Sequence, residues 1–297
     1  MPALHRTTLT PPKPFDLKLA LHGHGWIYLE PHRFDEATAT WHVPLHAGAS
    51  VVDVSVRQQG DRLLLRIAAP RKLAPKAIAA LRTEVARMLR LHDDLVPFWQ
   101  ACSDHPSLRW TGELGAGRLL RSPTVFEDLM KLLFTTNCTW TGTVAMTKNL
   151  VQAIGPTSPS GARAFPSAAE CARDETFYRE VVRAGYRAAS CAQLAAAFRD
   201  GTLDDAHFAD RDLDTETLRQ RLLALRGFGP YAAGQALRLL GHYDDLALDS
   251  WCRATMAQKQ NRKAPPSDRW FERRYAPFGK HAGLALWCEL TADWHGK

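Results

Sequence analysis

The sequence predicts an α+β fold in which a small antiparallel sheet precedes a mainly helical body. Three short runs, at 41–45, 51–54 and 63–67, are β-branched or alternate apolar with polar side chains, and Gly, Pro or Asp residues bound them. Residues 15–29 alternate in the same way and are expected to add a strand. From Lys72 onward the apolar residues recur at helical spacing, which predicts helices for the rest of the chain.

Two parts of the chain are expected. Residues 1–110 form the sheet domain with a linking helix, and residues 111–297 form the helical region. Apolar side chains have the helical period at 78–89 and again at 126–133, where a Ser-Pro start signal precedes them. Residues 275–287 are expected to pack as a final helix against the body.

Composition and charge bound the function. The 297 residues are 45% hydrophobic, enough for a large core without covalent staples, and the formal net charge of +7 favours a polyanionic partner. The six cysteines are scattered without any CxxC pair, which argues against a zinc or iron-sulfur site and suits a reducing compartment. Since no stretch has the roughly 18 apolar residues that a bilayer needs, we expect a soluble, monomeric, cytoplasmic protein, associated with the nucleoid if bacterial.

The most informative segment is residues 215–254, and its first part, the hairpin at 215–240, contains two helical stretches joined by Gly227, Phe228 and Gly229. Glycines permit positive φ and a close approach of the backbone, so successive N–H groups can face an anion. Pro230 is placed to start the second helix, whose positive dipole end adds to the attraction. The segment therefore predicts a hairpin that holds a DNA phosphate, although a plain helix-helix turn would use the same glycines.

A carboxylate follows the hairpin in the loop at 246–251, where Asp249 stands directly before another helical stretch. An aspartate at this place is a natural N-cap, and that is the structural alternative. When an N-glycosidic bond breaks, positive charge develops on the deoxyribose, and a fixed carboxylate can stabilise it or orient a water molecule. The two roles are compatible, because a cap holds the carboxylate in one orientation.

These residues carry a family resemblance. The run LRGFGPYAA at 225–233, followed by LALDSW at 246–251, resembles the helix-hairpin-helix, Gly/Pro-rich loop and Asp signature of the HhH-GPD DNA glycosylases. Further stretches resemble, in order, those of 8-oxoguanine DNA glycosylases: GRLLRSP at 117–123, TTNC at 135–138, FPS at 165–167 and GYR at 185–187. The resemblance covers roughly residues 10–260.

The resemblance implies a base-excision-repair enzyme that flips a damaged or mismatched base out of double-stranded DNA into a cleft between two helical subdomains. It makes Asp249 the catalytic aspartate and Asn137 the side chain that fills the hole left by the extruded base, a role that suits its donors and acceptors. Together with the hairpin it predicts a set of DNA-binding residues: Asn137, Gly227, Phe228, Gly229, Tyr231 and Trp251.

One departure from the family decides the predicted chemistry. Bifunctional members have a lysine in the hairpin that forms a Schiff base with the sugar, and Tyr231 occupies the equivalent position here. A phenol forms no imine, so we expect a monofunctional enzyme in which water attacks and an abasic site remains. Two alternatives stay open: lyase activity through another amine, such as Lys148 or Lys280, and a lesion binder without catalysis.

The substrate stays open as well. His24 and Trp26, with Tyr231, are candidates for the base pocket, where electron-rich rings would stack on a cationic alkylated purine; they fit a sheet core or surface equally well. No cofactor or metal is predicted, and whether a monovalent cation occupies the hairpin stays open. Four tryptophans are expected in the core: Trp140, Trp251, Trp270 and Trp287. Five basic residues are expected to contact phosphate or to form a solvated face: Arg118, Arg121, Lys131, Arg163 and Arg187.

Overall fold

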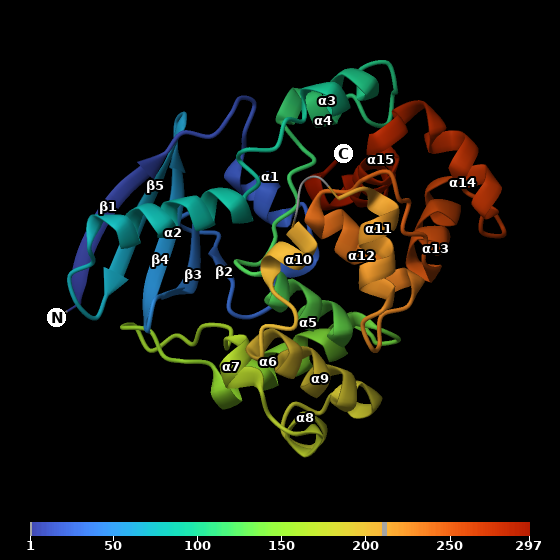
Figure 1. Cartoon of the computed structure of the whole chain (residues 1–297). Helices are drawn as coiled ribbons and strands as arrows, with labels where there is room; N and C mark the ends of the chain where they lie inside the picture. Colours follow the sequence, from blue (N-terminus) through green and yellow to red (C-terminus); the bar gives the residue numbers. More distant parts are fainter. Residues whose placement is uncertain (1, 210–212) are drawn as a thin grey trace.

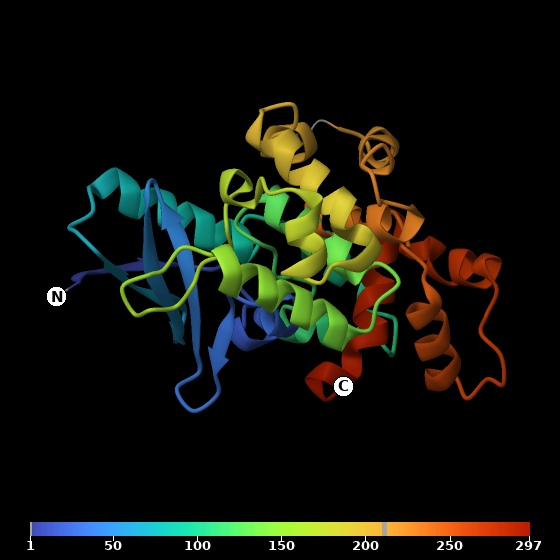
Figure 2. The same cartoon turned by 90° about the horizontal axis from the view of Figure 1, so that it is seen from below.

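The computed structural model of the chain describes residues 2–209 and 213–297. The N-terminal sheet lies at one side of the molecule and the C-terminal helices at the other, and the helices of residues 125–199 lie below and between them in Figure 1 (Figures 1 and 2). The predicted α+β class, with the sheet first and the helices after it, is confirmed.

The sheet has five antiparallel strands. Its spatial order is β1 (Ala3–Leu9), β5 (Arg62–Ala69), β4 (Ser50–Gln59), β3 (Thr40–Ala47) and β2 (Arg33–Asp35). Val54 pairs with Val43 on one side and with Ile67 on the other, and all three are buried. Because side chains alternate along a strand, this register places the apolar residues of three strands on one face. Helix α2 (Pro75–Met88) packs against that face with Leu81 and Val85 buried (Figure 1).

The strand expected at residues 15–29 is wrong, because this segment forms helix α1 (Leu17–His22) and the short 3-10 helix η1 (Gly25–Tyr28). Asp16 starts α1 by accepting a hydrogen bond from the backbone N–H of Leu19 at 2.7 Å. Apolar residues at 17 and 21 fit a period of two and also a helical turn, so the pattern alone did not separate the two structures. The N-cap hydrogen bond of Asp16 favours the helix.

The helical region begins with α3 (Val96–Cys102), α4 (Trp110–Leu114), α5 (Val125–Thr135), α6 (Trp140–Ile154), α7 (Ala168–Cys171), α8 (Glu175–Glu180), η2 (Gly185–Arg187) and α9 (Ala188–Arg199). It continues with α10 (Asp205–Ala209), α11 (Thr215–Leu223), α12 (Pro230–Leu240), α13 (Ser250–Lys259), α14 (Asp268–Tyr275), η3 (Ala276–His281), α15 (Ala282–Thr291) and η4 (Ala292–His295). The helix expected at 275–287 is therefore interrupted: Gly279, with φ of 52° and ψ of −125°, breaks the helical backbone within η3, and α15 begins only at Ala282. No helix in the described ranges is long and apolar enough to cross a membrane.

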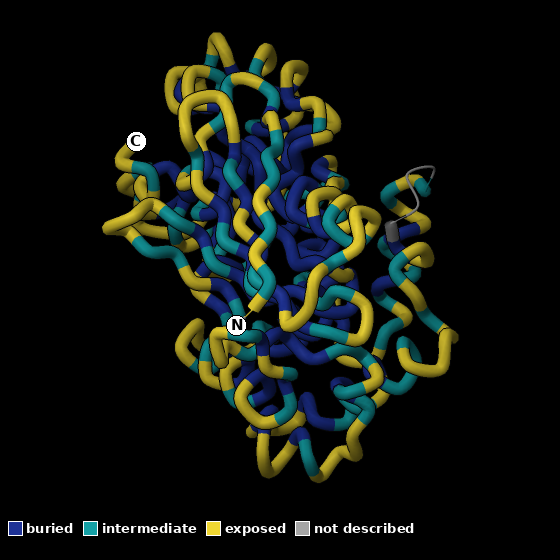
Figure 3. Tube along the Cα trace, turned by 90° about the vertical axis from the view of Figure 1, so that its left-hand side faces the viewer, coloured by how far each residue is buried: buried dark blue, intermediate teal, exposed yellow. Residues whose placement is uncertain are grey.

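Two hydrophobic cores organise these elements, and the buried segments run through the interior of both (Figure 3). The first core joins the sheet to α5, α9, α11 and α12. The second joins α3 and α4 to α13, α14 and α15. Residues 95–110, expected to belong with the sheet domain, thus pack with the C-terminal helices. The cores define the two helical groups between which the candidate site lies.

Candidate active site

The hairpin forms as expected, with α11 and α12 packed side by side and Pro230 opening α12. Gly227 has a φ of 88°, in the left-handed region. Gly229, however, is the N-cap of α12 with a φ of −99°, so the positive φ expected at both glycines is confirmed only at Gly227. A β-carbon at Gly229 would meet nothing within 4 Å, whereas the space beside Gly227 is filled by Ser190 and Leu133. The two glycines therefore serve different purposes.

The pair Gly227→Ala and Gly229→Ala separates these purposes. A β-carbon at 227 would lie 2.8 Å from Ser190 Oγ and 3.0 Å from Leu133 Cδ2, in a backbone conformation that L residues disfavour. We expect Gly227→Ala to lower the free energy of unfolding by about 2 to 4 kcal/mol. Gly229→Ala should leave stability unchanged within about 0.5 kcal/mol and weaken duplex binding, because its methyl group stands between a phosphate and the N–H groups that begin α12.

Urea denaturation and fluorescence anisotropy with an undamaged duplex measure the two effects. If Gly229→Ala binds the duplex as tightly as the unaltered protein, the start of α12 does not hold a phosphate. Gly227→Ala, studied at a temperature where it remains folded, serves as the matched substitution at the same turn.

Asp249 is the N-cap of α13, and its Oδ1 accepts a hydrogen bond from the backbone N–H of Cys252 at 2.6 Å. Its other oxygen, Oδ2, has no hydrogen bond from any described residue. The half-buried carboxylate is thus anchored through one oxygen while the second is available to a ligand. Asp249 therefore does act as an N-cap, the structural alternative named above, and this role is compatible with catalysis because it uses only one carboxylate oxygen.

The loop before Asp249 is held from below by a buried arginine. Arg238 of α12 is 1% exposed and donates hydrogen bonds to the Leu246 carbonyl at 3.1 Å and to Gln235 Oε1 at 2.7 Å. In the same loop, Ala247 has a φ of 48°, and its N–H donates to the Asp245 carboxylate. The carboxylate of Asp249 is therefore positioned by two fixed points, the loop behind it and the helix after it.

An aromatic pocket of about 530 Å³ opens beside Asp249. His24, Trp26, Tyr231 and Trp251, all predicted for the base pocket or for DNA binding, line it together with Asp249. The remaining lining residues are Gly25, Tyr28, Leu132, Thr135, Cys138, Trp140, Thr143, Gln235, Trp287 and Trp294. Burial raises the pKa of the Tyr231 phenol, and the Asp249 charge acts in the same direction. Segments more than 200 residues apart in sequence thus meet around one carboxylate.

The expectation that the tryptophans lie in the core is wrong for two of them. Trp140 is 44% exposed and Trp251 39% exposed, and both face the pocket. Trp287 is buried as expected but still reaches the pocket wall, with its ring centroid 5.7 Å from that of Trp251. Trp270 is half-buried away from the pocket. Sequence reasoning missed Tyr28 and Trp294, which lie in separate surface segments and carry no local signal of a shared cavity.

Trp140 occupies its place because the opposite wall has a glycine. A β-carbon at Gly25 would come within 2.8 Å of the Trp140 ring. On the same segment, the Trp26 indole donates a 2.7 Å hydrogen bond to the buried carboxylate of Asp128, which fixes the ring. The short segment that carries His24, Gly25 and Trp26 thus forms one side of the pocket.

His24 lies in the pocket wall as a neutral imidazole. It is 5% exposed, and its ring centroid lies 4.5 Å from that of Trp26. Burial lowers the pKa of His24 to about 3, and the nearby charges of Arg238, Arg90 and Lys131 push it the same way. At neutral pH this side chain adds no positive charge to the pocket.

The pKa of His24 makes stability depend on pH. In the unfolded chain a histidine binds a proton below about pH 6.5, whereas folded His24 does so only near pH 3. Acid therefore favours the unfolded state between these values. We expect His24→Gln to remove about 1.4 kcal/mol per pH unit from the slope of unfolding free energy between pH 6 and pH 4. Glu84, whose pKa is raised to about 7, contributes to the pH dependence of the unfolding free energy with the opposite sign. This contribution is the same in the unaltered protein and in His24→Gln, so it cancels in the comparison. Equal slopes from chemical denaturation would show that His24 titrates normally.

Asn137, expected to fill the gap in the DNA, lies exposed on the turn between α5 and α6 with a φ of 43°. Arg187 holds this turn by donating to the carbonyls of Thr136 and Asn137, the latter at 3.1 Å. The exposed Tyr186 ring stacks against the Arg187 guanidinium at 4.4 Å, and its hydroxyl accepts a 3.3 Å hydrogen bond from Asn137 Nδ2. The asparagine is therefore presented to solvent on a rigid turn.

Several predicted contacts with DNA are not available. Phe228 is 6% exposed and packs in the first core, so its side chain does not face a duplex. Four of the five basic residues expected at phosphates or on a solvated face are buried instead: Arg118, Arg121, Lys131 and Arg187. Lys131, for example, is paired with Glu127 at 2.5 Å. Arg163 is half-exposed and donates to the Gly155 carbonyl at 2.7 Å.

No protein-family model matches the sequence, and no curated protein matches it closely. Solved structures do. A 3-methyladenine DNA glycosylase from Archaeoglobus fulgidus superposes with a TM-score of 0.77 at 14% identity over 98% of this chain and 99% of that one. MBOgg1, solved with a low-affinity DNA ligand, gives 0.75 at 18% identity over the whole of both chains. The Clostridium acetobutylicum 8-oxoguanine glycosylase/lyase, solved with DNA containing cytosine opposite 8-oxoguanine, gives 0.66 at 16% identity over 92% of this chain and 93% of that one. The chain has the fold of these DNA glycosylases, as the resemblance implied.

Proposed function

We propose that the chain is a monofunctional DNA glycosylase of base-excision repair, which flips a damaged base into the aromatic pocket and leaves an abasic site. The observation that carries this proposal is the position of Asp249, which lines a pocket large enough for a purine and uses only one of its two carboxylate oxygens to cap α13. The hairpin that begins α12 lies on the same helix as Tyr231 and Gln235 of that pocket. The start of α12, which binds the DNA phosphate in this proposal, and the base pocket are therefore rigidly connected, as extrusion of a base requires.

The chemistry follows from the charge that develops. As the C1′–N bond breaks, its electron pair leaves with the base and the sugar becomes positive. Asp249 stabilises this positive charge and orients a water molecule, which adds to C1′ and gives a proton to the carboxylate and from there to solvent. A cationic alkylated purine leaves as a neutral base and needs no proton. The products are the free base and an abasic deoxyribose. Because hydrolysis of this bond involves no change of oxidation state, we infer no redox cofactor.

The pocket favours a cationic alkylated purine as the substrate. Indole rings attract cations through their electron-rich faces, and the neutral His24 does not oppose them. Arg238 lies 4.7 Å from the Trp287 ring and reduces the attraction there, so Trp251 and Trp140 are the better stacking partners.

The lyase alternative loses support from the placement of the two lysines. Lys148 is exposed on α6, and Lys280 lines a different cavity at the far end of α12. The described residues that line the aromatic pocket include no lysine. By the resemblance of the hairpin sequence, Tyr231 stands where the bifunctional members have their Schiff-base lysine.

One experiment tests both substrate and mechanism. The purified protein is incubated with duplexes carrying alkylpurines, 8-oxoguanine, hypoxanthine, uracil or thymine opposite guanine, with and without hot alkali. We expect release of alkylpurines, strand breakage only after alkali, and no DNA adduct on borohydride reduction. A trapped adduct would replace this proposal with a lyase, and release of no base at all would favour a lesion binder.

A further inference from the structure

A second cavity, of about 810 Å³, lies at the end of α12 opposite the hairpin. Leu240 and Gly241 line it, whereas Tyr231 and Gln235 at the start of the same helix line the aromatic pocket. Eleven helical residues span about 16 Å, and the two cavities share no lining residue. The second cavity is therefore separate from the site proposed for the base.

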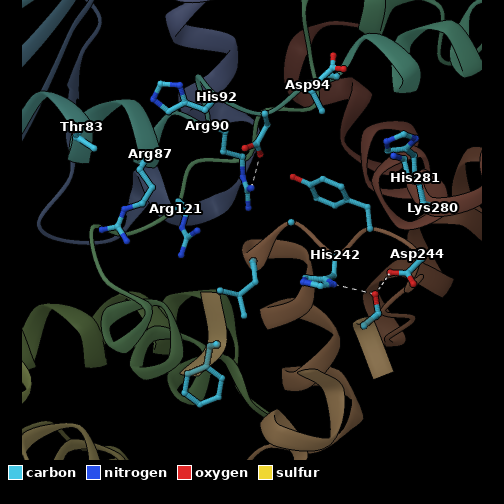
Figure 4. A pocket seen from close by; sticks show the side chains of 17 residues that line it. Thr83, Arg87, Arg90, His92, Asp94, Arg121, His242, Asp244, Lys280 and His281 are labelled. Carbon is cyan, nitrogen blue, oxygen red and sulfur yellow. Dashed lines mark hydrogen bonds and ion pairs between the residues drawn. The ribbon is translucent and has the colours of Figure 1, made fainter. Parts of the chain in front are cut away.

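Three arginines point into this cavity from one side, as Figure 4 shows for Arg87, Arg90 and Arg121. Arg90 is engaged: it pairs with Asp93 at 2.8 Å and donates to the Leu239 carbonyl at the end of α12. Arg87 lies 3.7 Å from Asp205, a loose contact at a partly exposed place. Each of the three arginines thus has one carboxylate within 4 Å, but the contacts of Arg87 and Arg121 are longer than hydrogen bonds.

Arg121 is the least satisfied of the three. Its side chain is 7% exposed, and Nε and Nη2 have no hydrogen-bond partner among the described residues. Asp128 Oδ2 lies 3.6 Å from Nε, beyond hydrogen-bonding distance. Burial lowers the pKa of this guanidinium; Asp128 opposes the shift, while Arg90 and Arg87 add to it. An anion between these guanidinium groups would relieve both the missing hydrogen bonds and the repulsion.

Tyr243 supplies an independent observation. Its ring is 7% exposed in the cavity lining, and its hydroxyl is buried without a partner among the described residues. A buried hydroxyl that lacks a hydrogen bond costs free energy, so a group that accepts or donates one is expected there. Two unpartnered groups, one charged and one neutral, therefore line the same space.

The opposite wall carries acceptors. Asp244 lies on the other side of the cavity from Arg87 and Arg121 (Figure 4). The carboxylate of Asp94, by contrast, points away from the arginines and accepts a 3.0 Å hydrogen bond from the Val96 N–H at the start of α3. Asp244 accepts a 2.8 Å hydrogen bond from the Thr215 hydroxyl, which also lies 3.0 Å from His242 Nδ1. A carboxylate accepts hydrogen bonds from hydroxyl or amino groups, so Asp244 suits the polar end of a ligand whose anionic end lies on the arginines. The volume is that of pockets for small organic molecules and far exceeds that of a single ion.

We propose that this cavity binds a small organic phosphate of nucleotide size, with its phosphate on Arg121 and Arg87 and its hydroxyl or amino end toward Asp244. Tyr243 contributes a hydrogen bond to the phosphate end. The site is independent of the proposed glycosylase activity, since none of its residues belongs to the aromatic pocket.

Calorimetric titration of the whole protein with AMP, ribose 5-phosphate, inorganic phosphate and adenosine tests the site. AMP and ribose 5-phosphate should bind more tightly than inorganic phosphate, and adenosine should give no heat of binding. Arg121→Gln should weaken AMP binding at least about tenfold, through loss of charge-assisted hydrogen bonds. Tyr243→Phe, which removes only the unpartnered hydroxyl, and Lys280→Gln, at an exposed lining residue, should weaken it less.

Arg62→Gln, an exposed arginine of β5 outside both cavities, is the matched control and should bind AMP normally. Gly229→Ala should also bind AMP normally, because the hairpin is not the site. Binding of adenosine equal to that of AMP, or unchanged AMP affinity in folded Arg121→Gln, would overturn the proposal. Displacement of AMP by an undamaged duplex would assign the arginines to DNA contact instead. If Arg121→Gln does not fold, undiminished AMP binding in both Tyr243→Phe and Lys280→Gln would overturn the proposal in its place.

Discussion

Asp249→Asn is expected to lower the rate of base release by about a hundred- to a thousandfold, which is the usual loss when one preorganised electrostatic group is removed. Asparagine remains a good N-cap, so its side-chain oxygen can still accept the hydrogen bond from Cys252 N–H and α13 should stay intact. What disappears is the negative charge beside the developing positive sugar. Single-turnover release of the base, measured with enzyme in excess over damaged duplex, reports this loss directly.

Asp214→Asn is the matched control, because Asp214 caps α11 in the same way, accepting a 2.9 Å hydrogen bond from Thr217 N–H, and lies outside the aromatic pocket. It should excise at the rate of the unaltered protein. Both variants should bind damaged duplex normally by anisotropy. Excision by Asp249→Asn at an undiminished rate would remove Asp249 from the mechanism, and a loss of binding equal to the loss of rate would indicate a structural role only.

The elements that sequence predicted well are those that local chemistry determines. Pro230 can only begin a helix, Asp249 has a free backbone N–H three residues ahead, and Gly227 meets a turn that needs positive φ. Alternation in β4 and β5 likewise needs only the pleat of a strand and one buried face. These features depend on neighbours within a few residues, which is the range over which a single sequence can be interpreted.

The composition of the aromatic pocket could not be predicted in this way, because it depends on contacts between segments that are distant in sequence. Tyr28, Trp140 and Trp294 come from three segments that meet only after both cores have packed. Tryptophan is usually buried, so its exposure at 140 and 251 follows from tertiary structure, and at 140 also from the small residue opposite, Gly25.

The burial of the arginines could not be predicted from the sequence for a related reason. Arg90 and Arg187 end on backbone carbonyls from distant turns, at the end of α12 and between α5 and α6, and no spacing in the sequence announces such partners. A guanidinium with five donors can satisfy several carbonyls at once, which makes arginine suitable for this role. Net charge therefore overstated the positive surface that is available to DNA.

The pocket predicts a second large effect, on the choice of base. Trp251→Ala removes an exposed indole whose ring centroid lies 5.7 Å from that of Trp287 and 6.1 Å from that of Trp294. Stacking of a base on an aromatic side chain contributes about 1 to 3 kcal/mol, and a cationic base adds attraction to the ring face. We expect release of alkylpurines to slow at least about tenfold. Release of hypoxanthine, a neutral base, should slow less, because only the stacking contribution is lost.

Trp251→Phe distinguishes charge attraction from simple packing, since phenylalanine keeps a stacking ring with a weaker attraction for cations. It should restore most of the rate on neutral bases and only part of the rate on alkylpurines. Trp270→Ala is the control: Trp270 stacks with Arg262 and Arg274 away from the pocket and should leave both rates unchanged. Equal losses on charged and neutral bases in Trp251→Ala would mean that the wall recognises shape alone. The preference for cationic purines would then have to be withdrawn, while hydrolysis assisted by Asp249 would stand.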